Sequence, residues 1–157
     1  MRDEKRAWII FALAVVFAII AAPVLYVTAS NLAAKLAEEN FYRAHPILNS
    51  MRAVHHHQGV DWDARNVLLQ HLPLGTSSAT VFSALAAEAF TCITYAGSND
   101  AIRRASGLDH VDAKGTLATC GANPPTQLGQ MEWTVSLSFG EDGRLLDAAV
   151  RGDWLFL

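Results

Sequence analysis

The stretch Trp8–Ala29, WIIFALAVVFAIIAAPVLYVTA, sets the organisation of this chain of 157 residues because it contains no charged side chain. It lies within a longer uncharged run between Arg6 and Lys35. An α-helix rises about 1.5 Å per residue, so the segment Trp8–Val27 would span roughly 30 Å, the hydrocarbon thickness of a lipid bilayer. The sequence therefore predicts one transmembrane helix, with the membrane lipid bilayer as its surroundings.

Basic residues precede this apolar run, since Arg2, Lys5 and Arg6 all lie before it. Positive charge next to a membrane helix favours the cytoplasmic side. We therefore expect a cytoplasmic N-terminus and an exported C-terminal part. In a bacterium with two membranes, the chain would be a single-pass inner-membrane protein with its folded domain in the periplasm.

The same stretch admits a second interpretation, a cleaved signal peptide. Val27-Thr28-Ala29 forms a V-x-A cleavage site before Ser30. The apolar run is longer than the about 7–15 residues of a signal-peptide core, which favours an uncleaved signal anchor. We expect residues 1–30 to form the cytoplasmic tip and anchor, residues 31–60 a juxtamembrane helix and linker, and residues 61–157 the exported domain.

Helical periodicity continues past the membrane segment over residues 31–43 and is interrupted at His45-Pro46. The interruption is expected because the residue before a proline is pushed out of the α region. Pro46 suits the first turn of a short helix, which we expect over residues 47–56. The anchor helix should therefore extend out of the membrane before the chain bends.

Two further helices are expected in the domain. Asp61 or Asp63 can cap the first, and the Pro-Gly turn at 72–75 ends it. Thr76 and Ser77 can cap the second, over residues 78–89, whose nearly charge-free composition predicts that it is largely buried.

The hydrophobic period then changes from 3.6 to 2, which is typical of strands. The clearest strand alternates Trp133, Val135, Leu137 and Phe139 with small hydroxyl residues. Strands are expected at 90–95, 116–120, 133–139 and 144–151, with a helical turn at 100–105. The sequence thus predicts an α+β fold: a transmembrane helix, then two helices packed on a three- or four-stranded antiparallel sheet.

Cys92 and Cys120 are the two cysteines of the chain, and they fall in neighbouring expected strands. In an exported domain this pattern favours a structural disulfide bond. Two separate buried thiols are an alternative. A redox or metal role is disfavoured because the C-x-x-C spacing is absent.

The segment His55-His56-His57 could bind zinc or copper, with His45, His71 or His110 as a further ligand. Consecutive helical residues point about 100° apart, so three adjacent histidines on a helix cannot reach one ion. In an extended segment, His55 and His57 could. A periplasmic metal-binding protein is therefore the alternative function, and a solvated histidine run is the simpler interpretation.

Other classes of function lack sequence support. The part from Asn31 onward carries nine Lys and Arg against thirteen Asp and Glu, a formal charge of −4 without a basic patch, which argues against nucleic acid. Asp61, Asp63 and Glu88 have no partner at a catalytic spacing and are expected to be a cap and helix-surface charges. We predict no catalytic residue, no enzyme and no cofactor. Trp154 and Phe156, near an unusually apolar terminus, are the candidates for a protein-binding patch.

Two stretches carry a family resemblance: 72–85, LPLGTSSATVFSAL, and 133–150, WTVSLSFGEDGRLLDAAV. The first resembles the helix–turn–helix segment of SmpA/BamE-like envelope domains, and the second resembles the meander that follows it there. The resemblance implies a small periplasmic module that binds other envelope proteins or the cell wall. The lipidated cysteine usual in that family has no counterpart, since no cysteine precedes Cys92. We expect a membrane-anchored interaction or accessory module, such as a single-span subunit of a membrane protein complex.

Overall fold

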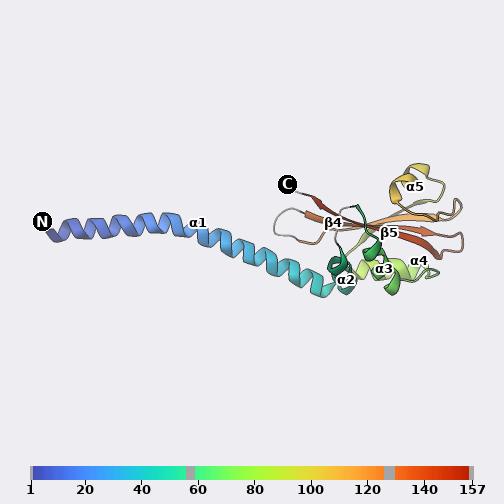
Figure 1. Ribbon diagram of the computed structural model, residues 1–157, viewed down its shortest axis with the longest axis horizontal. Helices are drawn as coiled ribbons and strands as arrows, with labels where there is room; N and C mark the ends of the chain where they lie inside the picture. The colour runs from blue at the N-terminus through green and yellow to red at the C-terminus, as the bar shows by residue number, and fades with distance from the viewer. Residues whose placement is uncertain (1, 56–58, 126–129, 156–157) are drawn as a thin grey trace.

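The computed structural model describes residues 2–55, 59–125 and 130–155. A 43-residue helix, α1 (Arg2–Ala44), projects from one end of an α+β domain (Figure 1). At about 1.5 Å per residue, α1 is roughly 65 Å long. Its stretch Ile19–Ala44 is long and apolar enough to cross a membrane, and the most apolar part of that stretch has no residue buried against the domain. By length and composition, it could serve as a membrane anchor or a signal sequence.

α1 ends where the sequence predicts, just before His45-Pro46. Pro46 begins α2 (Pro46–Val54), and the two helices are joined by buried and polar contacts. Tyr42 is only 2% exposed, and the guanidinium of Arg52 lies 4.3 Å from the centre of its ring. Arg52 also forms a 2.7 Å ion pair with Glu38. The C-terminal end of α1 is thus fixed to the domain by its own side chains.

Two helices follow, each capped by one of the two residues that the sequence offers. Asp61 caps α3 (Trp62–His71) by accepting a hydrogen bond from the N–H of Ala64. Ser77 caps α4 (Ser78–Ala87). The expectation that this second helix is largely buried is wrong, since Val81 and Leu85 are its buried residues and the others are partly or fully exposed.

The expectation that Glu88 is a surface charge is wrong. Glu88 is 4% exposed, and its carboxylate accepts a 3.0 Å hydrogen bond from the N–H of Leu48. A carboxylate in this position satisfies one of the free N–H groups in the first turn of α2, and negative charge is favourable there. Glu88 therefore joins the end of α4 to the start of α2.

The sheet has five strands, all antiparallel to their neighbours, in the order β1-β5-β4-β3-β2. The α+β prediction is confirmed, and the strand not predicted is the two-residue β1. The strands and the remaining helix are β1 (Gly59–Val60), β2 (Thr91–Ala96), α5 (Asp100–Ser106), β3 (Thr116–Ala122), β4 (Gln130–Phe139) and β5 (Leu145–Leu155).

The two faces of the sheet have different coverings. α2, α3 and α4 lie against one side, which we call the inner face, and α5 lies on the other side, the outer face (Figure 1). The apolar residues of β4 point inward, and Trp133 and Leu137 are fully buried there. The core is therefore the two-layer packing that the alternation in β4 predicts.

Candidate binding groove on the outer face

A groove of about 430 Å³ lies between α5 and the outer face of the sheet. The alternation that buries Trp133 and Val135 places Thr134 and Ser136 in this groove, because successive side chains of a strand point to opposite faces. Its walls come from α5 and from the four strands β2 to β5. They are formed by Tyr95, Ile102, Ala105, Ser106, Thr119, Thr134, Ser136, Arg151 and Asp153.

The groove combines hydroxyl groups with one cation and one anion. Thr119 lies opposite Ser136, and Thr134 lies opposite Arg151, so that neighbouring strands bring their polar side chains together. The Nε of Arg151 is 4.0 Å from a carboxylate oxygen of Asp153. Such a surface offers donors and acceptors to a polar or peptide-like ligand.

Arg151 has spare hydrogen-bonding capacity. Its Nε atom is buried, and no atom in the described part of the chain is within hydrogen-bond distance of it. The side chain as a whole remains 43% exposed, so the rest of the guanidinium is accessible. A guanidinium pairs with carboxylates through parallel N–H donors, which makes Arg151 the residue best suited to contact a ligand in the groove.

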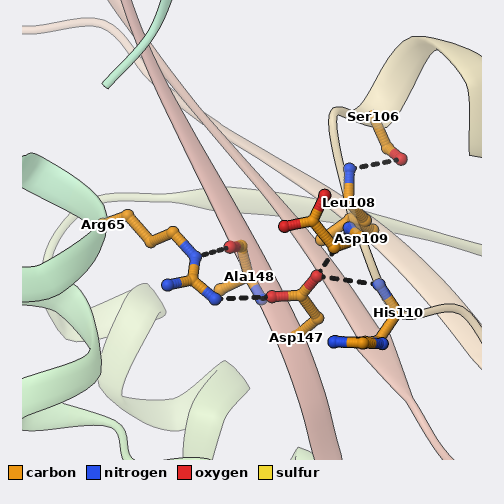
Figure 2. Close-up of polar contacts among 7 residues, drawn as sticks. All are labelled: Arg65, Ser106, Leu108, Asp109, His110, Asp147 and Ala148. Carbon is orange, nitrogen blue, oxygen red and sulfur yellow. Dashed lines mark hydrogen bonds and ion pairs between the residues drawn. The ribbon is translucent and has the colours of Figure 1, made fainter. Parts of the chain in front are cut away.

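α5 forms the roof of the groove, and the loop that follows it is bonded to the buried Asp147 of β5 (Figure 2). Asp147 is 1% exposed. Its Oδ2 accepts hydrogen bonds from the N–H groups of Asp109 and His110, at 2.7 and 3.0 Å, in the loop that follows α5. Its Oδ1 accepts a 2.8 Å bond from Arg65 of α3. Asp147 therefore links the loop on the outer face with a helix of the inner face.

Arg65 uses a second donor on the same strand. Its Nε donates to the carbonyl oxygen of Ala148 at 2.6 Å (Figure 2). Burial alone would raise the pKa of the Asp147 carboxyl, but the hydrogen bonds from Arg65 and from three backbone N–H groups outweigh it. The pKa of Asp147 consequently lies below its ordinary value, and the group is a carboxylate at neutral pH.

Residues next to α5 in the sequence end the helix at both termini. Asn99 caps the N-terminus by accepting from the N–H of Ile102. At the C-terminus, Gly107 adopts φ +69°, a left-handed conformation that glycine adopts easily, and Ser106 bonds to backbone groups on both sides of the turn. The sequence predicts only a helical turn here, at 100–105, and gives no indication that the turn roofs a groove.

The predicted cysteine pair is brought together. Cys92 and Cys120 lie directly opposite in β2 and β3, at disulfide-bonding distance, with a Cα–Cα distance of 3.9 Å. Cys120 is fully buried in the core on the inner face, and Cys92 packs against it. The pair therefore fastens β2 to the rest of the sheet and takes no part in the groove.

The histidines are dispersed in the described part of the chain. His55 Nδ1 lies 2.6 Å from Asp61 Oδ2, and the ring packs edge-on against Trp133. His45 Nδ1 lies 2.7 Å from the carbonyl oxygen of Phe41. Within residues 2–55, 59–125 and 130–155, no three His, Cys, Asp or Glu side chains gather as metal ligands would. His57, the other predicted ligand, lies outside the described residues, so the metal site stays a prediction.

The apolar terminus is described only in part. Trp154 belongs to β5, where its backbone pairs with Met131, and Phe156 lies outside the described residues. The protein-binding patch proposed for these two residues therefore stays a prediction. The groove, Arg151 and Asp147 were not among the predicted site residues, although a charged residue within the apolar run LLDAAV marks Asp147 as unusual.

Comparisons of this chain with protein-family models, with curated proteins and with solved structures find no match. The resemblance to SmpA/BamE-like domains therefore stays a prediction. The two stretches on which it was based, residues 72–85 and 133–150, contact each other in the fold. The N–H of Gly75 donates to the carbonyl oxygen of Leu145, the N–H of Leu145 donates to that of Thr76, and the N–H of Ser78 donates to that of Gly143.

Proposed function

We propose that this chain is a single-span, membrane-anchored interaction module whose exported domain binds another envelope or membrane protein. The observation that carries the proposal is the form of α1. The most apolar part of its stretch Ile19–Ala44 has no residue buried by the domain, while its distal end is joined to the domain by Tyr42 and by the Glu38–Arg52 ion pair. A helix of this kind holds a folded domain at a set distance from a bilayer.

The spacing follows from the helix geometry. If Trp8–Val27 spans the hydrocarbon layer, the remaining seventeen residues of α1 (28–44) extend about 25 Å beyond it. The positive flank at Arg2, Lys5 and Arg6 supports a cytoplasmic N-terminus and a periplasmic domain. The outer-face groove, with Arg151 and its hydroxyl groups, is then available to a partner in the same membrane or the periplasm.

The test is the state of the full chain in its native membrane. We expect mild-detergent extracts, separated on a native gel, to show the protein with residues 1–29 intact and co-migrating with other chains at fixed stoichiometry. Arg151→Ala should weaken this association, while Arg104→Ala, which removes an exposed arginine from α5 outside the groove, should not. Migration alone, or a soluble form that begins at Ser30, would overturn the proposal.

A further inference from the structure

Strand β2 leaves one edge of the sheet free. It is the last strand in the order β1-β5-β4-β3-β2, and its pairing with β3 is continuous from Thr91 to Ala96. Natural proteins protect such edges with lysine, proline, a bulge or a covering segment. The sequence TCITYA contains no charge and no proline, and its pairing contains no bulge.

The register shows which backbone groups of β2 face outward. The Cα atoms of Cys92 and Cys120 are 3.9 Å apart, as in a non-hydrogen-bonded pair, where they are about 4.5 Å apart instead of about 5.5 Å. The N–H of Gly97 donates to the carbonyl oxygen of Gly115, which places the odd-numbered residues in the hydrogen-bonded set. The N–H and C=O groups of Cys92 and Thr94 therefore point away from β3.

These four groups are free within the described residues. No hydrogen bond joins the backbone of Cys92 or Thr94 to any described segment outside the sheet, and no strand lies beyond β2. The next outward carbonyl, of Ala96, accepts from the N–H of Asn99 and so marks the end of the open edge. The free groups lie two residues apart, which is the repeat that an added strand requires.

Apolar surface lies on both sides of this edge. On the inner side, a groove of about 270 Å³ between α4 and β2 is lined by Phe82, Ala86 and Phe90, together with Cys92 and Thr94. On the outer side, Ile93 is 60% exposed. Successive side chains of a strand added to β2 would point alternately to these two surfaces.

We propose that β2 binds an extended segment of the partner protein as a sixth strand of the sheet. The segment pairs through the N–H and C=O groups of Cys92 and Thr94, and one of its apolar side chains enters the groove beside Phe82 and Phe90. Neither β2 nor this groove contains a charged residue, so the matching segment is uncharged and apolar at alternate positions. This inference rests on the proposed function and names how the partner binds.

A second copy of the chain fits this edge poorly. Symmetric antiparallel pairing of β2 with β2 rotates one chain by half a turn about an axis perpendicular to the sheet. α1 projects from one end of the domain, lengthwise with the strands, so the two anchors would leave in opposite directions (Figure 1).

The test places a photo-cross-linking amino acid at Ile93 of the full-length protein in native membranes. We expect a cross-link to an uncharged, alternately apolar segment of another protein. Thr94→Pro removes one outward N–H without removing a bond to β3, and proline is tolerated on edge strands. It should reduce the cross-link at least tenfold, whereas Thr94→Val, which keeps that N–H, should not.

A peptide with the cross-linked sequence then tests the pairing without any variant. It should protect the amides of Cys92 and Thr94 from hydrogen exchange in the purified full-length protein, and the same peptide N-methylated at alternate amides on its pairing edge should not. A cross-link to a second copy of this chain, a cross-link insensitive to Thr94→Pro, or equal protection by both peptides would overturn the inference.

A second cross-linking position, Thr134 in the outer-face groove, separates this inference from the proposed function. A partner captured at Thr134 but not at Ile93 would overturn strand addition and leave the interaction module intact. Capture at neither position, together with migration of the protein alone on the native gel, would overturn the proposed function itself.

Discussion

The two sides of the sheet differ in whether other segments bond to the outward backbone groups of β5 and β2. Along β5, other segments bond to backbone groups at several points between Leu145 and Gly152. β1 pairs with Arg151 and Gly152, and the N–H of Asp61 donates to Val150. Arg65 donates to Ala148, and the turn after α3 bonds to Leu145. Along β2, the outward groups of Cys92 and Thr94 have no such partner in the described chain.

The difference shows two ways to hold an outer strand. β5 is covered between Leu145 and Gly152 by segments and side chains that bond to its backbone, and an added strand would have to displace them. β2 is fastened by the Cys92–Cys120 pair, which acts through the inner face and uses none of its outward backbone groups. A cross-strand disulfide therefore stabilises an edge without closing it, and this is the condition that a strand-binding edge must meet.

The largest effect should come from breaking the covered edge at Asp147. Asp147→Leu leaves Arg65 and the N–H groups of Asp109 and His110 without their acceptor, and should lower the free energy of unfolding by about 4–5 kcal/mol. Chemical denaturation of the full-length protein in detergent would measure this. The exposed Asp100 is the matched control, since its ion pair with Arg103 is solvated, and Asp100→Ala should cost less than about 1 kcal/mol. Equal costs for both variants would contradict the role given to Asp147.

Removing the Cys92–Cys120 cross-link, which fastens β2, should lower the free energy of unfolding by a similar or slightly smaller amount. The Cys92→Ser/Cys120→Ser variant loses a cross-link with a sequence separation of 28, and the chain-entropy model predicts a cost of about 3–4 kcal/mol. Hydrogen exchange should show the amides of β2 opening before those of β4. Reductant should destabilise the wild type to the same extent and leave the variant unchanged. If the wild type were insensitive to reductant, the pair would not be fastening β2.

A smaller loss in the free energy of unfolding is expected when Arg65 is replaced by lysine, which keeps the positive charge but lacks the planar guanidinium. Lysine cannot bond to the Asp147 carboxylate and to the carbonyl oxygen of Ala148 with two fixed donors, as the guanidinium does. Arg65→Lys should therefore cost about 1 kcal/mol. Arg104→Lys, at an exposed position on α5, should cost nothing measurable in the same denaturation experiment. A cost for Arg65→Lys as large as for Asp147→Leu would mean that charge has no part in the bond to Asp147.

The sequence predicts the elements of this fold better than its edges. The alternation over 133–139, the caps at Asp61 and Ser77 and the break at Pro46 depend on neighbouring residues, and all are confirmed. The bonds that cover β5 join residues 69 or more positions apart, such as Thr76 and Leu145 or Arg65 and Asp147, and no local pattern reports such a pairing. For the same reason the sequence did not predict β1, which is two residues long and is defined by its pairing with β5, or the burial of Glu88, which bonds to the distant Leu48.

The candidate site shows the same limit. Thr134 and Ser136 are visible in the sequence as the polar half of an amphipathic strand, but this pattern is equally typical of a solvated face. They line a groove because α5 lies over that face, and the loop that follows α5 is bonded to Asp147. The disulfide was predictable because two cysteines in adjacent strands allow one pairing. The free edge was not predictable, since strand order is a property of the whole sheet.

The smallest effect on stability should come from a charge placed on each edge in turn. Ile93 and Leu74 are both large exposed apolar residues, 60% and 53% exposed, and Leu74 lies in the turn that covers the start of β5. Ile93→Lys and Leu74→Lys should each change the free energy of unfolding by less than about 0.5 kcal/mol. Lysine on an edge strand opposes the addition of another strand, so only Ile93→Lys should reduce the co-migration of the partner on a native gel. Equal loss of the partner in both variants would show that surface charge anywhere on the domain is disruptive. Loss with Leu74→Lys alone would place the partner at the covered edge and reverse the assignment of the two edges.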